Sequence, residues 1–124
     1  MFTRLIQIRN LAYRPEQKKL RNHLLQRNKP VCALCHRRMP HYILECAHIK
    51  PRVLCLPTEK VDFDNVEWMC RNCHKLFDTG HLGINNKRIF SSEELQQYPD
   101  LRFVNETDLE NDYFDYHFNH IFKK

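Results

Sequence analysis

The chain has 124 residues, of which 42% are hydrophobic and 28% are charged, and this ordinary composition predicts one globular domain. No apolar run approaches the roughly 20 residues that a membrane-spanning helix needs. Arg4 and Arg9 interrupt the apolar N-terminus, where a signal peptide would have an uncharged stretch. These features argue against a membrane or secreted protein and predict a cytoplasmic one, in which thiols stay reduced.

The formal net charge of +5 is unevenly distributed along the chain. Residues 1–30 hold eight Lys and Arg against one acidic residue, whereas residues 91–124 hold three against eight. A basic front suits a polyanion such as nucleic acid, although a solvated basic helix would have the same composition. We expect a basic helical segment at 1–29, a core at 30–90, and an acidic, aromatic helical extension at 91–124.

The first predicted element is a helix that begins near residues 13–16 (YRPE), because Pro is favoured in the first turn and Glu suits its positive end. Its buried face is predicted to carry Leu20, Leu24 and Leu25. Residues 28–30 (NKP) should end it.

Two strands and a helix are predicted next. Residues 41–49 (HYILECAHI) are rich in strand formers, and residues 50–64, with two prolines and two aspartates, indicate a loop. Residues 65–69 (NVEWM) alternate as a half-buried second strand does. A short helix should follow over 70–78, with Gly80 at its C-terminal end.

The last third predicts a hairpin and two helices. Residues 82–84 should pair with 89–90 around an Asn85-Asn86 turn, and Ser92 should cap a short helix. A final helix is predicted over 107–122, with an apolar side made of Leu109, Phe114, Phe118 and Phe122.

Two Cys-x2-Cys pairs, Cys32/Cys35 and Cys70/Cys73, predict a structural zinc site. Each turn directs two thiolates at one point, so two turns complete a closed tetrahedral site. A redox dithiol and three disulfide bridges are the alternatives, but neither pair lies in a βαβ pattern and the chain is expected in a reducing compartment. Cys46 and Cys55 have no nearby cysteine and are interpreted as small buried apolar residues.

The residues between and after these pairs resemble the HNH endonuclease family. His48 (in AHIKP), Asn65 and His74 (in N-x4-C-x2-CH-x2-FD-x-G) match the three signature residues of that family in order and in context. The resemblance covers roughly residues 30–90. It implies a small α+β fold with a ββα-metal core, a four-cysteine zinc knuckle and helices at both ends.

The resemblance also implies a role for each signature residue in DNA phosphodiester hydrolysis. His48 is expected to be the general base, because imidazole titrates near working pH. Asn65 is expected to orient His48 or to fix the loop through its amide. His74 is expected to bind Mg²⁺ or another divalent cation, with Asp78, four residues along the helix, as a second ligand.

The sequence departs from the commoner family pattern directly before the catalytic histidine. Many relatives have a metal ligand there, whereas this chain has Ala47. Glu45 has the same strand parity but lies about 6.6 Å back along the strand. Either Glu45 substitutes as a ligand, or Asp78 and water suffice.

Each signature residue also has a structural interpretation. His48 can be a hydrogen-bonded structural histidine, and Asn65 a turn residue that opens the strand. His74 can replace a cysteine in the zinc site or lie beside it. His117 and His120, three residues apart, are more typical of packing or surface residues than of a second metal site.

The expected partner is DNA. Lys50, Arg52, Arg71 and Lys75 flank the proposed centre and are candidates for binding backbone phosphates. A homodimer would place two centres about a two-fold axis for double-strand cleavage. The competing function is a non-catalytic zinc-knuckle module that binds nucleic acid through the same surface.

Overall fold

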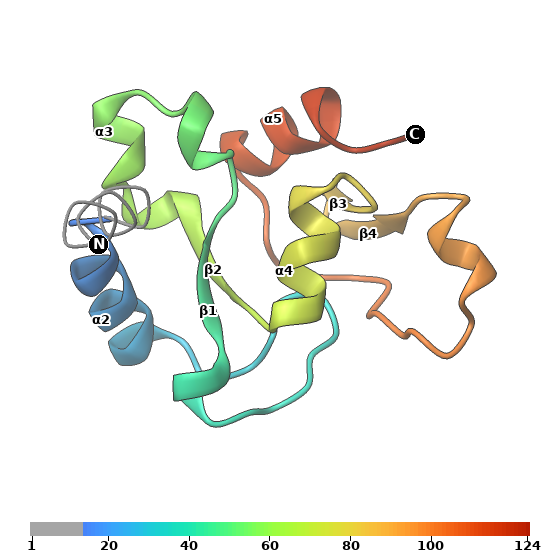
Figure 1. The fold of residues 1–124 in the computed structure, drawn as a ribbon, viewed down its shortest axis with the longest axis horizontal. Coiled ribbons are helices and arrows are strands. Elements are labelled where there is room, and N and C mark those ends of the chain that lie inside the picture. Colours follow the sequence, from blue (N-terminus) through green and yellow to red (C-terminus); the bar gives the residue numbers. More distant parts are fainter. Residues whose placement is uncertain (1–13) are drawn as a thin grey trace, which may run out of the picture.

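A computed structural model describes residues 14–124 of the chain (Figure 1). Tyr13 and the basic residues before it therefore lie outside the described part. The helices and strands are α2 (Gln17–Arg27), β1 (Glu45–His48), α3 (Pro57–Lys60), β2 (Val66–Met69), α4 (Arg71–Asp78), β3 (Leu82–Asn85), β4 (Arg88–Ser91) and α5 (Asp112–His120). Every helix within residues 14–124 is too short or too polar to span a lipid bilayer.

The centre of the fold is the antiparallel pair β1–β2, followed directly by α4. Cys46 lies opposite Trp68 and His48 opposite Val66 in the pair. Trp68 and Phe77 are fully buried. Figure 1 shows this sheet between α2 on one side and α4 on the other, with β3 and β4 beyond α4. The structure confirms the predicted small α+β fold with a ββα core.

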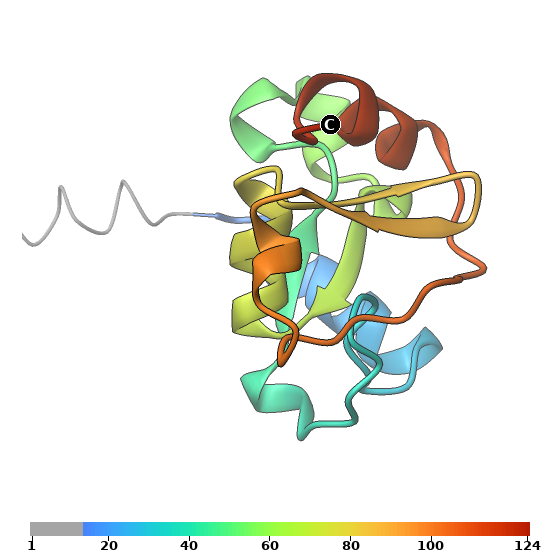
Figure 2. The same ribbon diagram turned by 90° about the vertical axis from the view of Figure 1, so that its right-hand side faces the viewer.

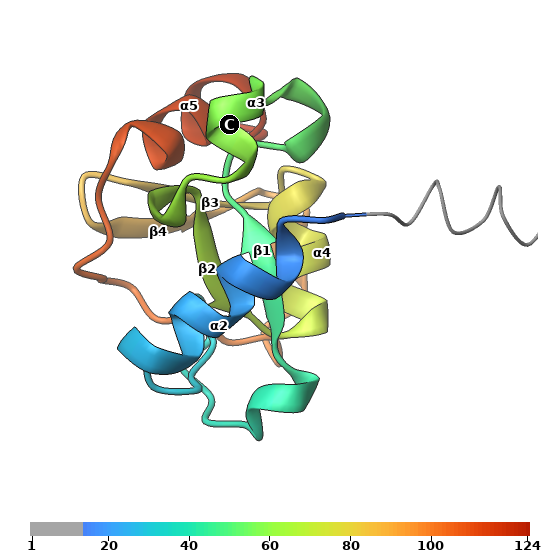
Figure 3. The same cartoon turned by 90° about the vertical axis from the view of Figure 1, so that its left-hand side faces the viewer.

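Helix α2 covers the outer face of the β1–β2 sheet (Figure 3). Leu20 and Leu24 are buried, and the Arg21 guanidinium lies 4.9 Å from the centre of the Trp68 ring. Leu25 is 40% exposed, so its predicted place on the buried face is wrong. A two-stranded sheet is narrow, and one stripe of the helix is enough to cover it.

The segment from residue 41 to residue 65 contains more helical turns than predicted. His41–Ile43 is a 3₁₀ turn after Pro40, so strand β1 begins only at Glu45. The predicted loop holds α3 and two further 3₁₀ turns, Arg52–Leu54 and Phe63–Asn65. Pro40, Pro51 and Pro57 stand at the start of three of these elements and preset a helical φ that a strand pattern does not reveal. The fourth, Phe63–Asn65, follows Asp62, whose side chain accepts from the Asp64 N–H.

Strands β3 and β4 form the predicted hairpin, with its turn shifted by one residue. Asn85 pairs with Arg88, and Asn86 and Lys87 occupy the turn with φ values of 51° and 62°. Two positive φ values in a two-residue loop are typical of a type I′ turn. The predicted Asn85-Asn86 turn is therefore wrong by one position, because a lysine takes the second left-handed place.

Helix α5 lies over the β3–β4 hairpin (Figure 2). It begins at Asp112, later than predicted, because the Asn111 side chain accepts hydrogen bonds from the backbone N–H groups of Tyr113 and Phe114. Its buried Phe114 and His117 pack against Phe77 of α4. Ser92 accepts a hydrogen bond from the Leu95 N–H, as predicted, at the start of a 3₁₀ turn.

Candidate functional site

The four predicted zinc ligands lie together at one end of the β1–β2 sheet. The sulfur atoms of Cys32, Cys35, Cys70 and Cys73 are all within 4.8 Å of one another, and those of Cys35 and Cys70 are 4.0 Å apart. Ligand atoms around a tetrahedral zinc with bonds of about 2.3 Å are about 3.8 Å apart. The cluster therefore fits a zinc knuckle.

The local backbone explains why the sulfurs converge. His36 has a φ of 57°, and its N–H donates to the Cys32 carbonyl to close the first turn. Cys70 precedes the first residue of α4, which brings Cys73 one turn along the helix. The hydrogen bond between Cys32 and Cys73 lowers the pKa of Cys32 against the effect of burial and raises the pKa of Cys73.

The remaining two cysteines differ from each other. All six cysteines lie in the described part of the chain and are free thiols, so the disulfide alternative is wrong. Cys46 is buried, and burial raises its pKa to about 12, as an inert packing residue would show. Cys55 is only partly buried, and its sulfur lies 3.3 Å from the Asn65 amide nitrogen. The interpretation of Cys55 as a buried apolar residue is therefore wrong.

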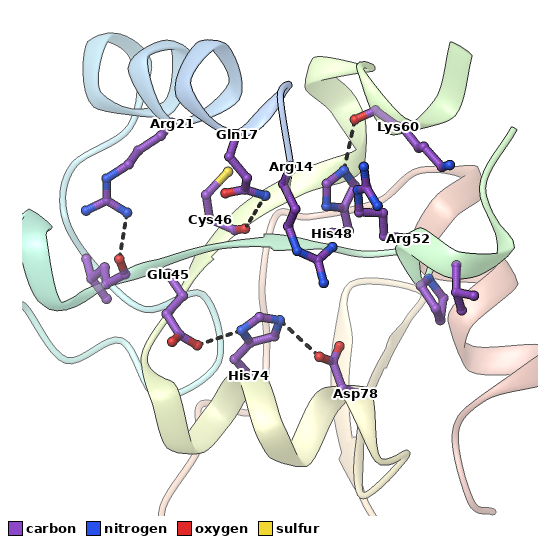
Figure 4. A pocket seen from close by; sticks show the side chains of 13 residues that line it. Arg14, Gln17, Arg21, Glu45, Cys46, His48, Arg52, Lys60, His74 and Asp78 are labelled. Atoms are coloured by element: carbon purple, nitrogen blue, oxygen red, sulfur yellow. Dashed lines mark hydrogen bonds and ion pairs between the residues drawn. The ribbon is translucent and has the colours of Figure 1, made fainter. Parts of the chain in front are cut away.

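A cavity of about 760 Å³ lies between α2 and the ββα core (Figure 4). Its wall on the side of the core includes Glu45 and His48 of β1 and His74 and Asp78 of α4, and α2 faces them across it. Arg52, a predicted phosphate-binding residue, also lines it, so the fold brings five predicted site residues into one cavity.

His48 ends β1 with its ring held in one orientation. Its Nε2 donates to the carbonyl of Lys60 at 2.9 Å, which leaves Nδ1 of the neutral ring as an acceptor. Burial lowers the pKa of His48, and the nearby charges of Arg52 and Arg14 lower it further. The hydrogen bond to the Lys60 carbonyl and the charge of Glu16 act in the opposite direction, but burial outweighs them. The lowered pKa favours the neutral ring, which can accept a proton.

Asn65 is fully buried and closes the loop that carries Lys60. Its Oδ1 accepts from the Lys50 backbone N–H at 2.9 Å, and its Nδ2 donates to the Glu59 carbonyl at 3.1 Å. The Glu59 carbonyl belongs to the peptide that joins Glu59 to Lys60, and the Lys60 carbonyl is the partner of His48. Of the two predicted roles, this geometry matches fixing the loop, since the Asn65 amide bonds the loop backbone.

His74 lies between two carboxylates (Figure 4). Its Nδ1 is 2.7 Å from Glu45 Oε1, and its Nε2 is 3.0 Å from Asp78 Oδ2. Burial lowers the pKa of His74, but the hydrogen bonds and charges of Asp78 and Glu45 outweigh it, and the net pKa is raised. The two acids thus attract positive charge to this ring.

Only the Nε2 side of the His74 ring has the geometry of a site for a divalent cation. His74 Nε2 and Asp78 Oδ2 are as close together as adjacent ligands of an ion with bonds of about 2.1 Å. Glu45 bonds the opposite nitrogen, where a carboxylate orients a metal-binding histidine. Within residues 14–124, only the four cysteines bring three or more such ligand atoms close enough to share one ion.

Residues 32–85 match the family model described as HNH endonuclease. We call this segment the HNH domain, after the family that it matches. It contains the four clustered cysteines together with His48, Asn65 and His74, and both α2 and α5 lie outside it. No curated protein matches the chain.

The HNH domain uses two of its four predicted phosphate-binding cations in internal contacts. Lys50 Nζ bonds Glu59 at 2.9 Å and lies 4.6 Å from the Tyr116 ring centre, and Arg52 pairs with the buried Glu16 of the segment before α2. Arg71 and Lys75 are exposed on α4. The sequence did not reveal the two ion pairs, because one of them joins residues 36 positions apart.

Arg14 lines the cavity from the side of α2 and was not among the predicted site residues. It lies outside the HNH domain, where the sequence indicated only that residues 1–30 are basic.

Proposed function

We propose that this protein is a metal-dependent endonuclease that hydrolyses phosphodiester bonds in DNA. The observation that carries the proposal is the presence, in one cavity, of a neutral histidine with a free Nδ1 and of a histidine–aspartate pair suited to a cation. The HNH domain supports a nuclease, and the net charge of +5 suits a polyanionic substrate.

His48 acts as the general base in this proposal. Its Nδ1 accepts a proton from water as the water oxygen forms a bond to phosphorus and the bond to the leaving oxygen breaks. The Lys60 carbonyl keeps the proton on Nε2, so the ring presents its lone pair in one direction. Asn65 holds the backbone that supplies this carbonyl.

His74 and Asp78 would hold the catalytic divalent cation, and Glu45 would orient the His74 ring through Nδ1. When bound, a divalent cation stabilises negative charge on the phosphate and the leaving oxygen. Two protein ligands suit Mg²⁺, which usually keeps several waters and binds one or two carboxylates together with substrate phosphates. We propose zinc for the four-cysteine cluster, where it would serve the fold alone.

The test is cleavage of supercoiled plasmid by purified protein with Mg²⁺, Mn²⁺ or Ni²⁺ and without added metal, beside the His48→Ala variant. We expect metal-dependent nicking or linearisation that falls by about 100-fold or more in the variant, since a positioned base contributes 10²–10⁴-fold. His81→Ala is the matched control, because His81 bonds Ser92 and lies outside the cavity.

Cleavage that persists unchanged in His48→Ala would refute the assignment of the base. Plasmid binding without cleavage under every metal would favour the competing function, a zinc module that binds nucleic acid. Linear product at early times would indicate two centres acting together, as in a homodimer, whereas open circles alone would indicate nicking.

A further inference from the structure

The cavity has two walls of different origin. His48, His74 and Asp78 belong to the HNH domain, whereas Arg14, Gln17 and Arg21 come from α2 and the residues just before it. A substrate phosphate that reaches His48 must therefore pass beside residues that the family match does not include.

Two of the four Lys and Arg residues that line this cavity are already bonded within the protein. Arg21 donates to the carbonyls of Leu44 and His41 and lies over Trp68. Arg52 is paired with Glu16. In Figure 4 the Lys60 side chain extends away from His74.

Arg14 differs from them. Its side chain is exposed and has no hydrogen bond or ion pair to any other residue within 14–124. Figure 4 shows it extending toward the space between His48 and the His74–Asp78 pair. Both Arg14 and His48 line the cavity, and the charge of Arg14 is one of the smaller effects that lower the pKa of His48.

The backbone next to Arg14 is anchored, although the side chain has no partner among the described residues. The Arg14 carbonyl accepts from the Gln17 N–H at 3.0 Å, Gln17 Nε2 lies 3.5 Å from the Cys46 carbonyl, and Glu16 binds Arg52. These contacts attach the start of α2 to β1 and to the loop after His48. Arg14 is thus a positioned cation at the cavity, which is what phosphate recognition requires.

We propose that Arg14 binds the non-bridging oxygens of the scissile phosphate, which makes it a catalytic residue supplied from outside the HNH domain. This inference rests on the proposed nuclease function. A guanidinium presents a planar fork of donors that matches two phosphate oxygens, and its charge opposes the charge that develops on them during hydrolysis.

The first test uses bis(p-nitrophenyl) phosphate, a diester with a single phosphate, so that any effect must arise at the reacting group. We expect Arg14→Gln to lower kcat/KM by about 100-fold, as for other donors to transition-state oxygens. Arg14→Lys should recover part of this loss. Arg102→Gln is the matched control, because Arg102 is an exposed arginine that does not line the cavity.

The second test measures binding of a DNA duplex by fluorescence anisotropy at several salt concentrations, with His48→Ala in every protein to suppress cleavage. Adding Arg14→Gln should reduce the slope of log affinity against log salt by about one, as the loss of one phosphate contact does. Adding Arg102→Gln should leave the slope unchanged. Circular dichroism should show the same fold in all variants.

The outcomes separate the two proposals. If the wild-type protein hydrolyses neither plasmid nor diester, the nuclease function is overturned, and the salt slope still decides whether Arg14 binds phosphate. If Arg14→Gln and Arg102→Gln behave alike in both tests, the role of Arg14 is overturned while the nuclease function stands.

Discussion

His48 depends on one backbone acceptor for its orientation. Its Nε2–H has the Lys60 carbonyl as partner, and that carbonyl is positioned by a loop that Asn65 bonds at both ends. The ring is buried to 7% exposure, and burial is the main cause of its lowered pKa. At the scale of single residues, the surroundings of His48 therefore set both the orientation and the protonation state of the proposed base.

The lowered pKa predicts the shape of the pH profile. Because the base must be neutral, activity should be complete above the pKa of His48 and should be lost as the pH falls through it. Burial moves this acid limb below the ordinary histidine value of about 6.5. The measurement is kcat/KM for the diester between pH 4.5 and pH 8 at a saturating concentration of divalent cation, so that protonation of His74, whose pKa is raised, does not limit activity. A midpoint at or above 6.5 would then contradict the proposed environment of His48. His23→Gln, a change outside this cavity, should leave the limb in place.

At the scale of elements, α5 supports the loop between β1 and β2. Tyr113 Oη donates to Asp62 at 2.6 Å, and the Asn111 amide donates to the Asp64 carbonyl at 2.9 Å. The Tyr116 ring faces the Lys50 ammonium. These contacts hold both ends of the loop that presents the Lys60 carbonyl, so a helix outside the HNH domain contributes to the position of the base.

Tyr113→Phe tests this support by removing one hydroxyl. Loss of its hydrogen bond to a partly exposed carboxylate should lower the free energy of unfolding by about 1 kcal/mol and should reduce diester hydrolysis. Tyr116→Phe is the matched control, because it keeps the ring that faces Lys50. Urea unfolding and kinetics on both variants provide the measurement. Equal activity in the two variants would show that α5 does not influence the loop.

At the scale of the whole molecule, the four-cysteine cluster, for which we propose zinc, joins segments that are distant in sequence. Cys32 and Cys35 precede β1, and Cys70 and Cys73 follow β2, so one ion would join the chain before β1 to the chain after β2 at one end of the sheet. The Ala33 N–H also donates to the Trp68 carbonyl at 2.9 Å, which places the knuckle against the most buried part of the core.

Cys70→Ser should therefore abolish the fold. Structural zinc contributes roughly 10–16 kcal/mol in small zinc-binding peptides, which is comparable to the whole stability of a domain, about 5–15 kcal/mol. We expect loss of bound zinc in elemental analysis and no cooperative thermal transition by circular dichroism. Cys55→Ser, which changes a cysteine outside the cluster, should keep one zinc per chain. A folded, zinc-loaded Cys70→Ser protein would contradict the knuckle.

Patterns in the sequence predicted the parts of the fold that depend on interactions between residues close together in the chain. The paired cysteines, the strand before Cys70 and the helix after it follow from spacing and alternation, and the structure confirms them. The α5 start at Asp112 was missed because it depends on the Asn111 side chain. The exposed Leu25 was missed because helical periodicity does not reveal how wide a surface the helix covers.

The candidate site was predictable in its residue types and less so in its contacts. Spacing on one helix predicted that His74 and Asp78 share a face, and they do. Pairing of Arg52 with Glu16 and of Lys50 with Glu59 depends on the tertiary fold, so their use inside the protein could not be anticipated. Arg14 reaches the cavity for the same reason, across a distance in sequence that no motif spans.

Both glycines of the chain lie directly against residues near its C-terminal end. A methyl group on Gly80, whose φ is +83°, would lie 2.3 Å from the Ile121 carbonyl oxygen, and one on Gly83 would lie 2.9 Å from the Phe122 ring. Both glycines belong to the segment that matches the family, whereas Ile121 and Phe122 do not. The HNH domain therefore contains two positions where the lack of a side chain makes room for the C-terminal residues. Gly80 is required by its positive φ in any case, whereas Gly83 is required only by the Phe122 ring. Relatives that share the C-terminal helix are therefore expected to retain Gly83, and relatives without it are free to replace it, so Gly83 serves as a marker of the extended form.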